Sequence, residues 1–176
     1  MIKKIVKSGN LKLLELSKPV KKIDKKILSV VKDLTDTLAV QKDPEGVGLA
    51  ACQIGIPVRI FVMVKNGKII PIINPEVLEK EEEKIATKTK EGHEILEGCL
   101  SLPNYYTPLK RAGKIKIKYQ TPEGKEKIEE FNGFSAQIVQ HEIDHLNGIM
   151  FLGRLIEQKS KLYKLESGEW QEVELV

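Results

Sequence analysis

Three residues within a stretch of five have the types and the spacing needed for metal-assisted hydrolysis. His141 and His145 lie four positions apart, and Glu142 directly follows the first histidine. On a helix, residues four apart share one face about a turn apart, so both imidazoles can bind one metal ion. Glu142 lies about 100° around the helix from His141, where its carboxylate can accept a proton from water without being a ligand. The pattern predicts two metal ligands and a general base.

The neighbouring residues predict the helix that this pattern needs. Apolar and ligand side chains recur at the spacing of one inward-facing helical stripe: Phe134, Ile138, His141 and His145. Ser135 is expected to cap the start of the helix, and Gly148 suits the left-handed residue that ends one. The chain has three histidines, and the third, His93, lies in a charged stretch where we do not expect a ligand.

The third protein ligand is open at this point. A catalytic metal ion usually has three protein ligands and one open position. A histidine six residues after His145 is excluded, because position 151 is Phe. A glutamate farther along the chain would be Glu166 or Glu169. Upstream, Cys99 is the best candidate because a thiolate is a strong ligand and a glycine precedes it, while Cys52 competes on chemistry alone.

Length and composition predict one soluble domain. A chain of 176 residues with 41% hydrophobic residues is long enough for one packed core and short for two, so we expect a single catalytic domain over 1–176. No run approaches the ~18 apolar residues of a membrane span, and the N-terminus lacks the apolar core of a signal peptide. A cytoplasmic protein without a membrane partner is expected. The two cysteines do not form a disulfide framework.

The formal charge of +4 comes from 29 basic against 25 acidic residues. This small excess permits contact with nucleic acid but does not argue for it. We therefore expect no recognition of a specific nucleic-acid sequence.

Hydrophobic periodicity predicts a helix and several antiparallel strands. The helix spans 25–40, with Asp24 as its cap. Strands are expected at 58–64 and 68–73 around an Asn66-Gly67 turn, with Asn74-Pro75 ending the second strand and another beginning at 76–78, and at 114–120 and 125–131. The stretch 79–94 is expected to be an exposed excursion, and the tail from 161 to 176 a small hairpin.

The stretch 46–55 contains small residues in the loose GxGxxA form of a dinucleotide-binding turn. That interpretation fails, because no apolar strand precedes the stretch and no acidic residue stands about 20 positions beyond it. Small residues followed by Gln53 instead allow the backbone to approach a ligand closely while one side-chain amide points at it.

Three segments together resemble the signature motifs of the peptide deformylases. These are GVGLAACQIG at 46–55, EGCLS at 97–101 and QHEIDHLNG at 140–148. The resemblance extends over most of residues 9–155. It implies an α+β fold in which antiparallel strands surround a central helix carrying HExxH, with an N-terminal covering helix.

The resemblance also implies the roles of the site residues. Cys99, His141 and His145 would hold the metal ion, and Glu142 would be the catalytic acid/base. The backbone amide of Leu100 and the side-chain amide of Gln53 would receive the oxyanion. The family reaction removes the N-formyl group from the N-terminal formylmethionine of nascent polypeptides and releases formate. The metal in the cell would be Fe²⁺, with Ni²⁺, Co²⁺ or Zn²⁺ possible in a purified protein.

Substrate-binding residues are expected around these motifs. Gly48, with Leu49, would form a narrow slot that admits formyl and excludes acetyl. The expected substrate-binding residues come from the first two motifs and the helical stripe: Gly46, Val47, Glu97, Phe134 and Ile138. Formylated nascent peptides, and with them transient contact with the ribosome, are the expected partners.

Two further expectations concern the surroundings of the motifs. The family often has an arginine shortly after CLS, where this chain has Asn104, Tyr105 and Tyr106, so the resemblance does not extend to peptide binding beyond methionine. We also expect an ion pair between Arg111 and Asp144 that braces the motif helix.

Overall fold

The computed structural model describes residues 1–86 and 95–174. Its helical segments are η1 (Leu11–Leu14), α1 (Lys25–Ala39), η2 (Ala51–Ile54), α2 (Gly133–Leu146) and α3 (Phe151–Gln158). Its strands are β1 (Gly48–Ala50), β2 (Ile60–Lys65), β3 (Lys68–Lys80), β4 (Glu83–Ala86), β5 (Glu97–Cys99), β6 (Leu102–Thr107), β7 (Lys110–Ala112), β8 (Lys114–Gln120), β9 (Glu126–Asn132), β10 (Leu162–Glu166) and β11 (Glu169–Val173). Within these two described ranges, no helix is both long and apolar enough to cross a lipid bilayer.

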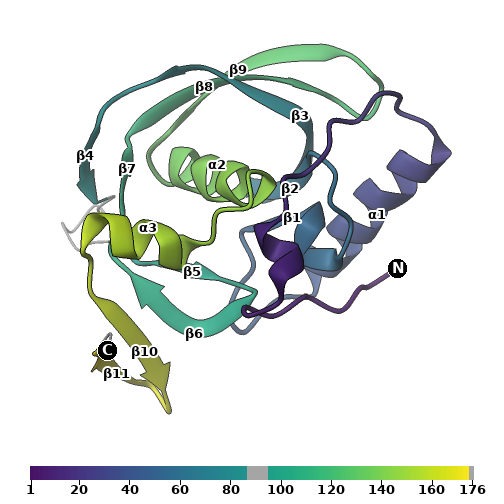
Figure 1. Ribbon diagram of the computed structural model, residues 1–176. Coiled ribbons are helices and arrows are strands. Elements are labelled where there is room, and N and C mark those ends of the chain that lie inside the picture. The colour runs from purple at the N-terminus through teal and green to yellow at the C-terminus, as the bar shows by residue number, and fades with distance from the viewer. Residues whose placement is uncertain (87–94, 175–176) are drawn as a thin grey trace.

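Antiparallel sheets surround a central helix. The larger sheet has the strand order β1-β2-β3-β8-β9, and a second sheet has the order β11-β10-β6-β5. A short ladder joins β4 to β7. Figure 1 shows the large sheet curving over α2, while β5 and β6 lie below it. The α+β fold with a central helix is confirmed.

Helix α2 is central because it is buried on all sides. Every residue from Ala136 to Leu146 is buried, which is typical of a core helix rather than of an amphipathic one. Its apolar residues pack with Phe61, Ile117 and Phe131 of the large sheet. The polar residues of the HExxH pattern are therefore held inside the protein.

Of the two predicted ends of α2, the C-terminal one is confirmed and the N-terminal one is wrong. Gly148 has the expected left-handed conformation, with φ of 72°. Ser135 is not the cap: the helix begins at Gly133 after Asn132, and no side-chain cap bond forms there among the described residues. The chain turns directly from β9 into α2, so Ser135 lies within the first turn. Phe134 does not point into the core and is 43% exposed.

Helix α1 covers the outer side of the large sheet, as expected. The Asp24 carboxylate accepts hydrogen bonds from the amides of Lys26 and Ile27, both at 3.0 Å. Leu34 and Leu38 are buried in a second apolar cluster with residues of β2. Figure 1 shows α1 on the far side of β1 and β2 from α2.

The predicted break at Asn74-Pro75 is wrong, because β3 continues through it. Asn74 adopts a φ of 51°, and the register with β8 shifts between Ile73 and Glu76. The Asn74 side chain bonds the backbone of Val20 and the side chain of Gln120. The irregularity is thus a bulge within one strand.

The remaining predicted elements have mixed outcomes. The hairpin of β8 and β9 is confirmed, and so is the C-terminal hairpin of β10 and β11. The expected excursion at 79–94 is in part strand, because β3 extends to Lys80 and β4 follows. The rest of that stretch, with His93, lies outside the described residues.

Candidate metal centre and active site

Cys99, His141 and His145 converge inside the protein. Cys99 ends β5, and both histidines come from α2. The Cys99 Sγ lies 3.2 Å from His145 Nε2, and the two histidine Nε2 atoms lie 3.1 Å apart. All three side chains are buried, and their ligand atoms lie within 4.8 Å of one another.

This arrangement fits one divalent metal ion. A zinc ion lies about 2.3 Å from a sulfur ligand and about 2.0–2.1 Å from a nitrogen ligand. Ligand atoms that bind the same ion must therefore lie as close to one another as the Cys99, His141 and His145 atoms do. A cation between two imidazole nitrogens that face each other at 3.1 Å stabilises the arrangement, because the lone pairs of the two nitrogens otherwise repel each other. The geometry of the side chains therefore brings Cys99 to both histidines as the candidate third ligand.

Glu97 fixes the orientation of His141. Its carboxylate Oε1 lies 2.7 Å from His141 Nδ1, so that nitrogen donates and Nε2 is left to face the centre. Burial raises the pKa of Glu97, but His141 and Arg111 outweigh it and lower the pKa to about 2. Both Glu97 oxygens are also bonded by Arg111. Glu97 therefore holds His141 in place, and its expected role in substrate binding stays a prediction.

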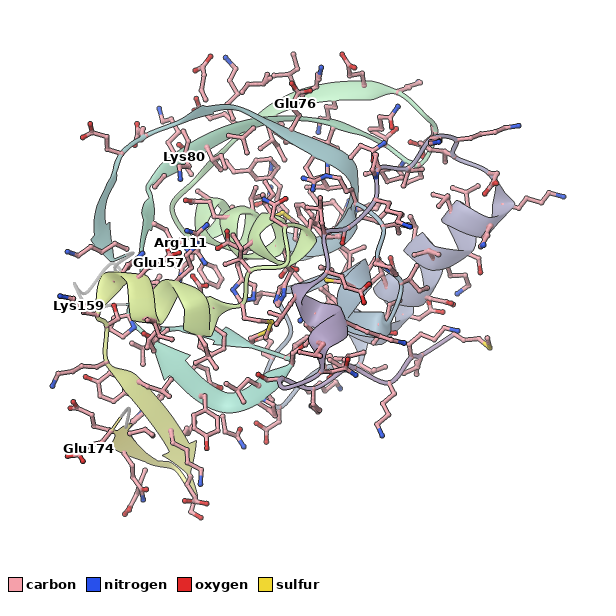
Figure 2. All side chains as sticks on the ribbon, viewed as in Figure 1. Glu76, Lys80, Arg111, Glu157, Lys159 and Glu174 are labelled. Atoms are coloured by element: carbon pink, nitrogen blue, oxygen red, sulfur yellow. The ribbon has the colours of Figure 1, made fainter. Side chains whose placement is uncertain are left out.

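The chain of charges continues from Arg111 to the surface. Arg111 Nη1 donates to Asp144 at 2.6 Å, which confirms the expected ion pair. Asp144 in turn accepts two hydrogen bonds from Arg154 of α3. Figure 2 labels Arg111 near α2 and α3 and labels Glu157 on α3. Glu157 forms an ion pair with Arg154 on the side away from Asp144. Opposite charges thus alternate from the metal centre to solvent.

The two cysteines lie in different environments. Burial disfavours the thiolate of Cys99, but His145 and His141 hold its pKa well below the usual value. Burial instead raises the pKa of Cys52 to about 12. The Cys52 Sγ lies 3.5 Å from the carbonyl oxygen of His145, within the core. Cys99 is therefore the cysteine that lies with the two histidines, whereas Cys52 is a buried thiol of the apolar core.

The glutamates Glu166 and Glu169 are not candidates for the third ligand. Both are exposed residues of the C-terminal hairpin, and Glu166 is paired with Lys164. The class of site with a downstream glutamate ligand is therefore excluded.

Glu142 lies beside the metal centre with its carboxylate turned towards Gly48. Burial raises the pKa of Glu142 to about 7, so the side chain can both accept and donate a proton near neutral pH. Its Oε2 has no hydrogen-bond partner within 1–86 and 95–174. An unpartnered buried oxygen at this place is available for a reacting group.

The side-chain amide of Gln53 lies beside the Cys99 sulfur. The Gln53 side chain accepts from the Ala50 amide at 2.8 Å through Oε1 and donates from Nε2 to Ser101 Oγ at 3.1 Å. These two bonds direct Nε2 towards the Cys99 sulfur, 3.5 Å away. Leu100 follows Cys99 directly. Ser101 was not anticipated from the sequence, because its partner Gln53 is 48 positions away.

A cavity of about 350 Å³ opens onto these residues. Expected site residues line it: Val47, Gly48, Gln53, Glu97, Cys99, Leu100, Phe134, Ile138, His141 and Glu142. Gly46 is absent from this lining and lies between Leu38 and Leu100 instead. The cavity wall also includes Tyr105 and Tyr106, which follow the cysteine motif on β6.

Comparison with known proteins gives a family match over most of the chain. A sequence profile of the polypeptide deformylases matches residues 2–161. The peptide deformylase of Pseudothermotoga lettingae is 40% identical over 152 residues, which are 86% of this chain and 82% of that protein.

Solved structures agree in fold. The crystal structure of peptide deformylase from Thermotoga maritima superimposes with a TM-score of 0.77 at 35% identity, covering 88% of this chain and 97% of that one. A class I type b peptide deformylase from Acinetobacter baumannii, crystallised with Met-Ala-Ser bound, gives a TM-score of 0.77 at 30% identity, covering 88% of this chain and 98% of that one. Sequence and fold therefore point to the same family.

Proposed function

This chain belongs to the peptide deformylase family of metal-dependent hydrolases, which remove the N-formyl group from nascent polypeptides, and we propose that Cys99, His141 and His145 hold its metal ion. The observation that carries the proposal is the convergence of one sulfur and two imidazole nitrogens beside a cavity that reaches the surface. We further propose that the chain acts as a single catalytic domain over 1–176.

A divalent metal ion held by these residues would supply Lewis-acid chemistry, because such an ion lowers the pKa of water and polarises a carbonyl group. The sulfur and nitrogen ligands suit iron and zinc alike. On the resemblance to the family we propose Fe²⁺ in the cell, with Ni²⁺, Co²⁺ or Zn²⁺ as replacements in the purified protein.

Glu142 is proposed as the acid/base of the reaction. Its buried carboxylate, with a pKa of about 7, takes the proton of the attacking water and later gives it to the leaving amine of methionine. Gly48 makes this position possible, because a side chain there would overlap the Glu142 carboxylate. The same close approach narrows the slot that receives the formyl group.

Gln53 and Leu100 are proposed to stabilise the negative charge on the formyl oxygen. The Gln53 amide is held in place from both ends, so it needs no reorganisation as charge develops. The loss of one such donor typically lowers kcat by about 100-fold or more.

The peptide is proposed to bind as an extended strand between two sheet edges. β1 is the last strand of the large sheet and β5 the last strand of the smaller one. Both line the cavity, through Gly48 and Gly98. An extended peptide can hydrogen-bond such edges. The methionine side chain then enters the apolar part of the cavity, formed by Val47, Phe134 and Ile138.

The proposed substrate also indicates where in the cell the protein acts. Formylated nascent chains emerge from ribosomes, so we propose a cytoplasmic enzyme that contacts the ribosome transiently.

Formate release from formyl-Met-Ala-Ser tests the proposed function. The iron- or nickel-loaded protein should release formate, and the Glu142→Gln variant should keep its metal while kcat falls by about 100-fold or more. The proposal fails if the loaded protein releases no formate, or if Glu142→Gln is as active as the parent.

A further inference from the structure

A short N-terminal segment, Ile5 to Ser8, is hydrogen-bonded to both parts of the chain that supply the proposed oxyanion donors. The backbone amide of Val6 donates to the carbonyl oxygen of Gln53, and that of Ser8 donates to the carbonyl oxygen of Ser101, each at 2.8 Å. Figure 1 shows the purple N-terminal trace reaching the start of β6 before it turns into η1. The segment lies outside the cavity wall that the structure describes.

Lys7 lies between these two backbone bonds and reaches the other donor residue, Leu100. The Lys7 ammonium donates to the carbonyl oxygen of Leu100 at 3.3 Å. Lys7 itself is exposed, whereas Leu100 is buried and lines the cavity. A hydrogen bond from a charged donor is stronger than one between neutral groups. A cation at the protein surface therefore holds the peptide group that follows the Leu100 amide.

The Leu100 amide is held along the chain from both directions. On one side is Cys99, a proposed metal ligand. On the other side, the carbonyl groups of Leu100 and Ser101 accept hydrogen bonds from Lys7 and Ser8. Rotation of the backbone at Leu100 would break these bonds, so its N–H keeps a fixed direction. A donor that is fixed before charge develops needs no reorganisation during the reaction.

The segment is anchored independently of Lys7. Ile5 is buried in the same apolar cluster as Leu100. Farther along the chain, the amide of Ser17 donates to the carbonyl oxygen of Leu146, at the end of α2, at 2.9 Å. The N-terminal part of the chain thus contacts all three signature segments, although it contains none of them. Loss of the Lys7 ammonium alone should therefore leave the segment in place.

We propose that Lys7 is a positioning residue for the oxyanion donors, acting through the backbone of Leu100. The inference rests on the proposed function, because it assumes that Leu100 and Gln53 receive the formyl oxygen. The positive charge of Lys7 also favours negative charge that develops near the Leu100 amide. Since Lys7 lies outside the described cavity wall, it should affect the transition state and not the binding of the peptide.

Steady-state kinetics of nickel-loaded Lys7→Met on formyl-Met-Ala-Ser test this inference. Methionine keeps an unbranched side chain but removes the ammonium group. The kcat should fall about tenfold, which is less than the ~100-fold expected for a whole donor, because the Leu100 amide remains but is less firmly held. The KM should stay within about twofold. Lys7→Arg should keep kcat within about threefold of the parent, because a guanidinium group can donate to the same carbonyl oxygen.

Lys4→Met is the matched control. It removes the same charge from an exposed position near the segment and should leave kcat and KM at the parent values. Hydrogen exchange of the Val6 and Ser8 amides separates positioning from local unfolding. Both amides donate to carbonyl groups of buried residues, so they should exchange slowly in the parent and in Lys7→Met alike. Metal content should also be the same in both proteins.

Four results would overturn the inference: an unchanged kcat in Lys7→Met, an equal loss in Lys4→Met, a loss that lies in KM, or a loss accompanied by fast exchange or by missing metal. Fast exchange of Val6 and Ser8 in the parent would overturn it as well. Each of these results leaves the proposed function intact as long as the parent releases formate. A parent that releases no formate refutes the proposed function together with the role of Lys7.

Discussion

The carboxylate of Glu142 lies against the backbone of Gly48, at the point where β1 passes α2. A Cβ built on Gly48 would overlap Glu142 Oε1 and come within 2.9 Å of its Cδ. The two residues are 94 positions apart in the sequence. The absence of a side chain on one strand therefore determines where the proposed acid/base can sit.

Gly48→Ala should inactivate the enzyme without unfolding it. The added methyl group must push the Glu142 carboxylate away from its place, and loss of a positioned acid/base lowers kcat by about 100-fold or more. The measurement is kcat on formyl-Met-Ala-Ser, with metal content and circular dichroism as checks.

Gly153→Ala is the matched control for that substitution. Among the residues that the structure describes, its new Cβ would meet nothing closer than Ile149 Cγ2 at 3.8 Å, and alanine is favoured over glycine in a helix such as α3. Activity should stay at the parent level. A fully active Gly48→Ala protein would contradict the role given to Glu142.

Arg111→Met should cost far more stability than Arg154→Met. Arg111 is buried between Glu97 and Asp144, so its loss leaves Glu97 buried without its cationic partner and should lower the free energy of unfolding by about 3–5 kcal/mol. Arg154 is partly exposed, and Asp144 keeps Arg111 without it, so about 1 kcal/mol is expected.

Urea unfolding of both arginine variants at equal metal loading gives the comparison. Equal losses for the two would show that the buried charges do not depend on Arg111.

Glu129 should make stability depend on pH in the acidic range. Burial raises its pKa, but hydrogen bonds from Lys65, Tyr119 and Lys127 outweigh it and lower the pKa to about 2. A lowered pKa contributes stability above the unfolded value of 4.5, and that contribution is lost as the pH falls towards 2. Glu129→Gln should thus lose about 2 kcal/mol at pH 7, and the gap should close as the pH falls from 5 to below 3.

Urea unfolding of the metal-free proteins at several pH values measures that gap. Glu130→Gln is the control, because Glu130 and its partner Lys114 are both about half exposed, and it should differ little from the parent at any pH. A gap that is the same at pH 7 and pH 3 would refute the role of Glu129.

Local patterns were sufficient for much of the fold. Helix α1, the β8-β9 hairpin and the C-terminal hairpin follow from periodicity and from turn residues that act within a few positions. The strand break expected at Asn74 is wrong, because the Asn74 side chain bonds Val20 and Gln120, which are 54 and 46 positions away. Such contacts replace the missing ladder bonds, and no local pattern contains them.

The site residues, like the fold, were predictable where a local pattern determines them and not where distant contacts do. The spacing of His141 and His145 identifies them from the sequence, because one helix positions both. Ser101 could not be found in this way, since its contact is with Gln53, a residue on another element. The sequence predicts Glu97 as a site residue, but only the structure reveals its contact with His141.

Metal content after removal of each cysteine tests the central claim most directly. The parent, Cys99→Ala and Cys52→Ala proteins are loaded with nickel, dialysed and measured for metal per chain. The parent and Cys52→Ala should retain about one ion, whereas Cys99→Ala, left with two of the usual three protein ligands, should retain far less and release no formate. A Cys99→Ala protein that keeps a full equivalent of metal would contradict the site proposed for Cys99, His141 and His145.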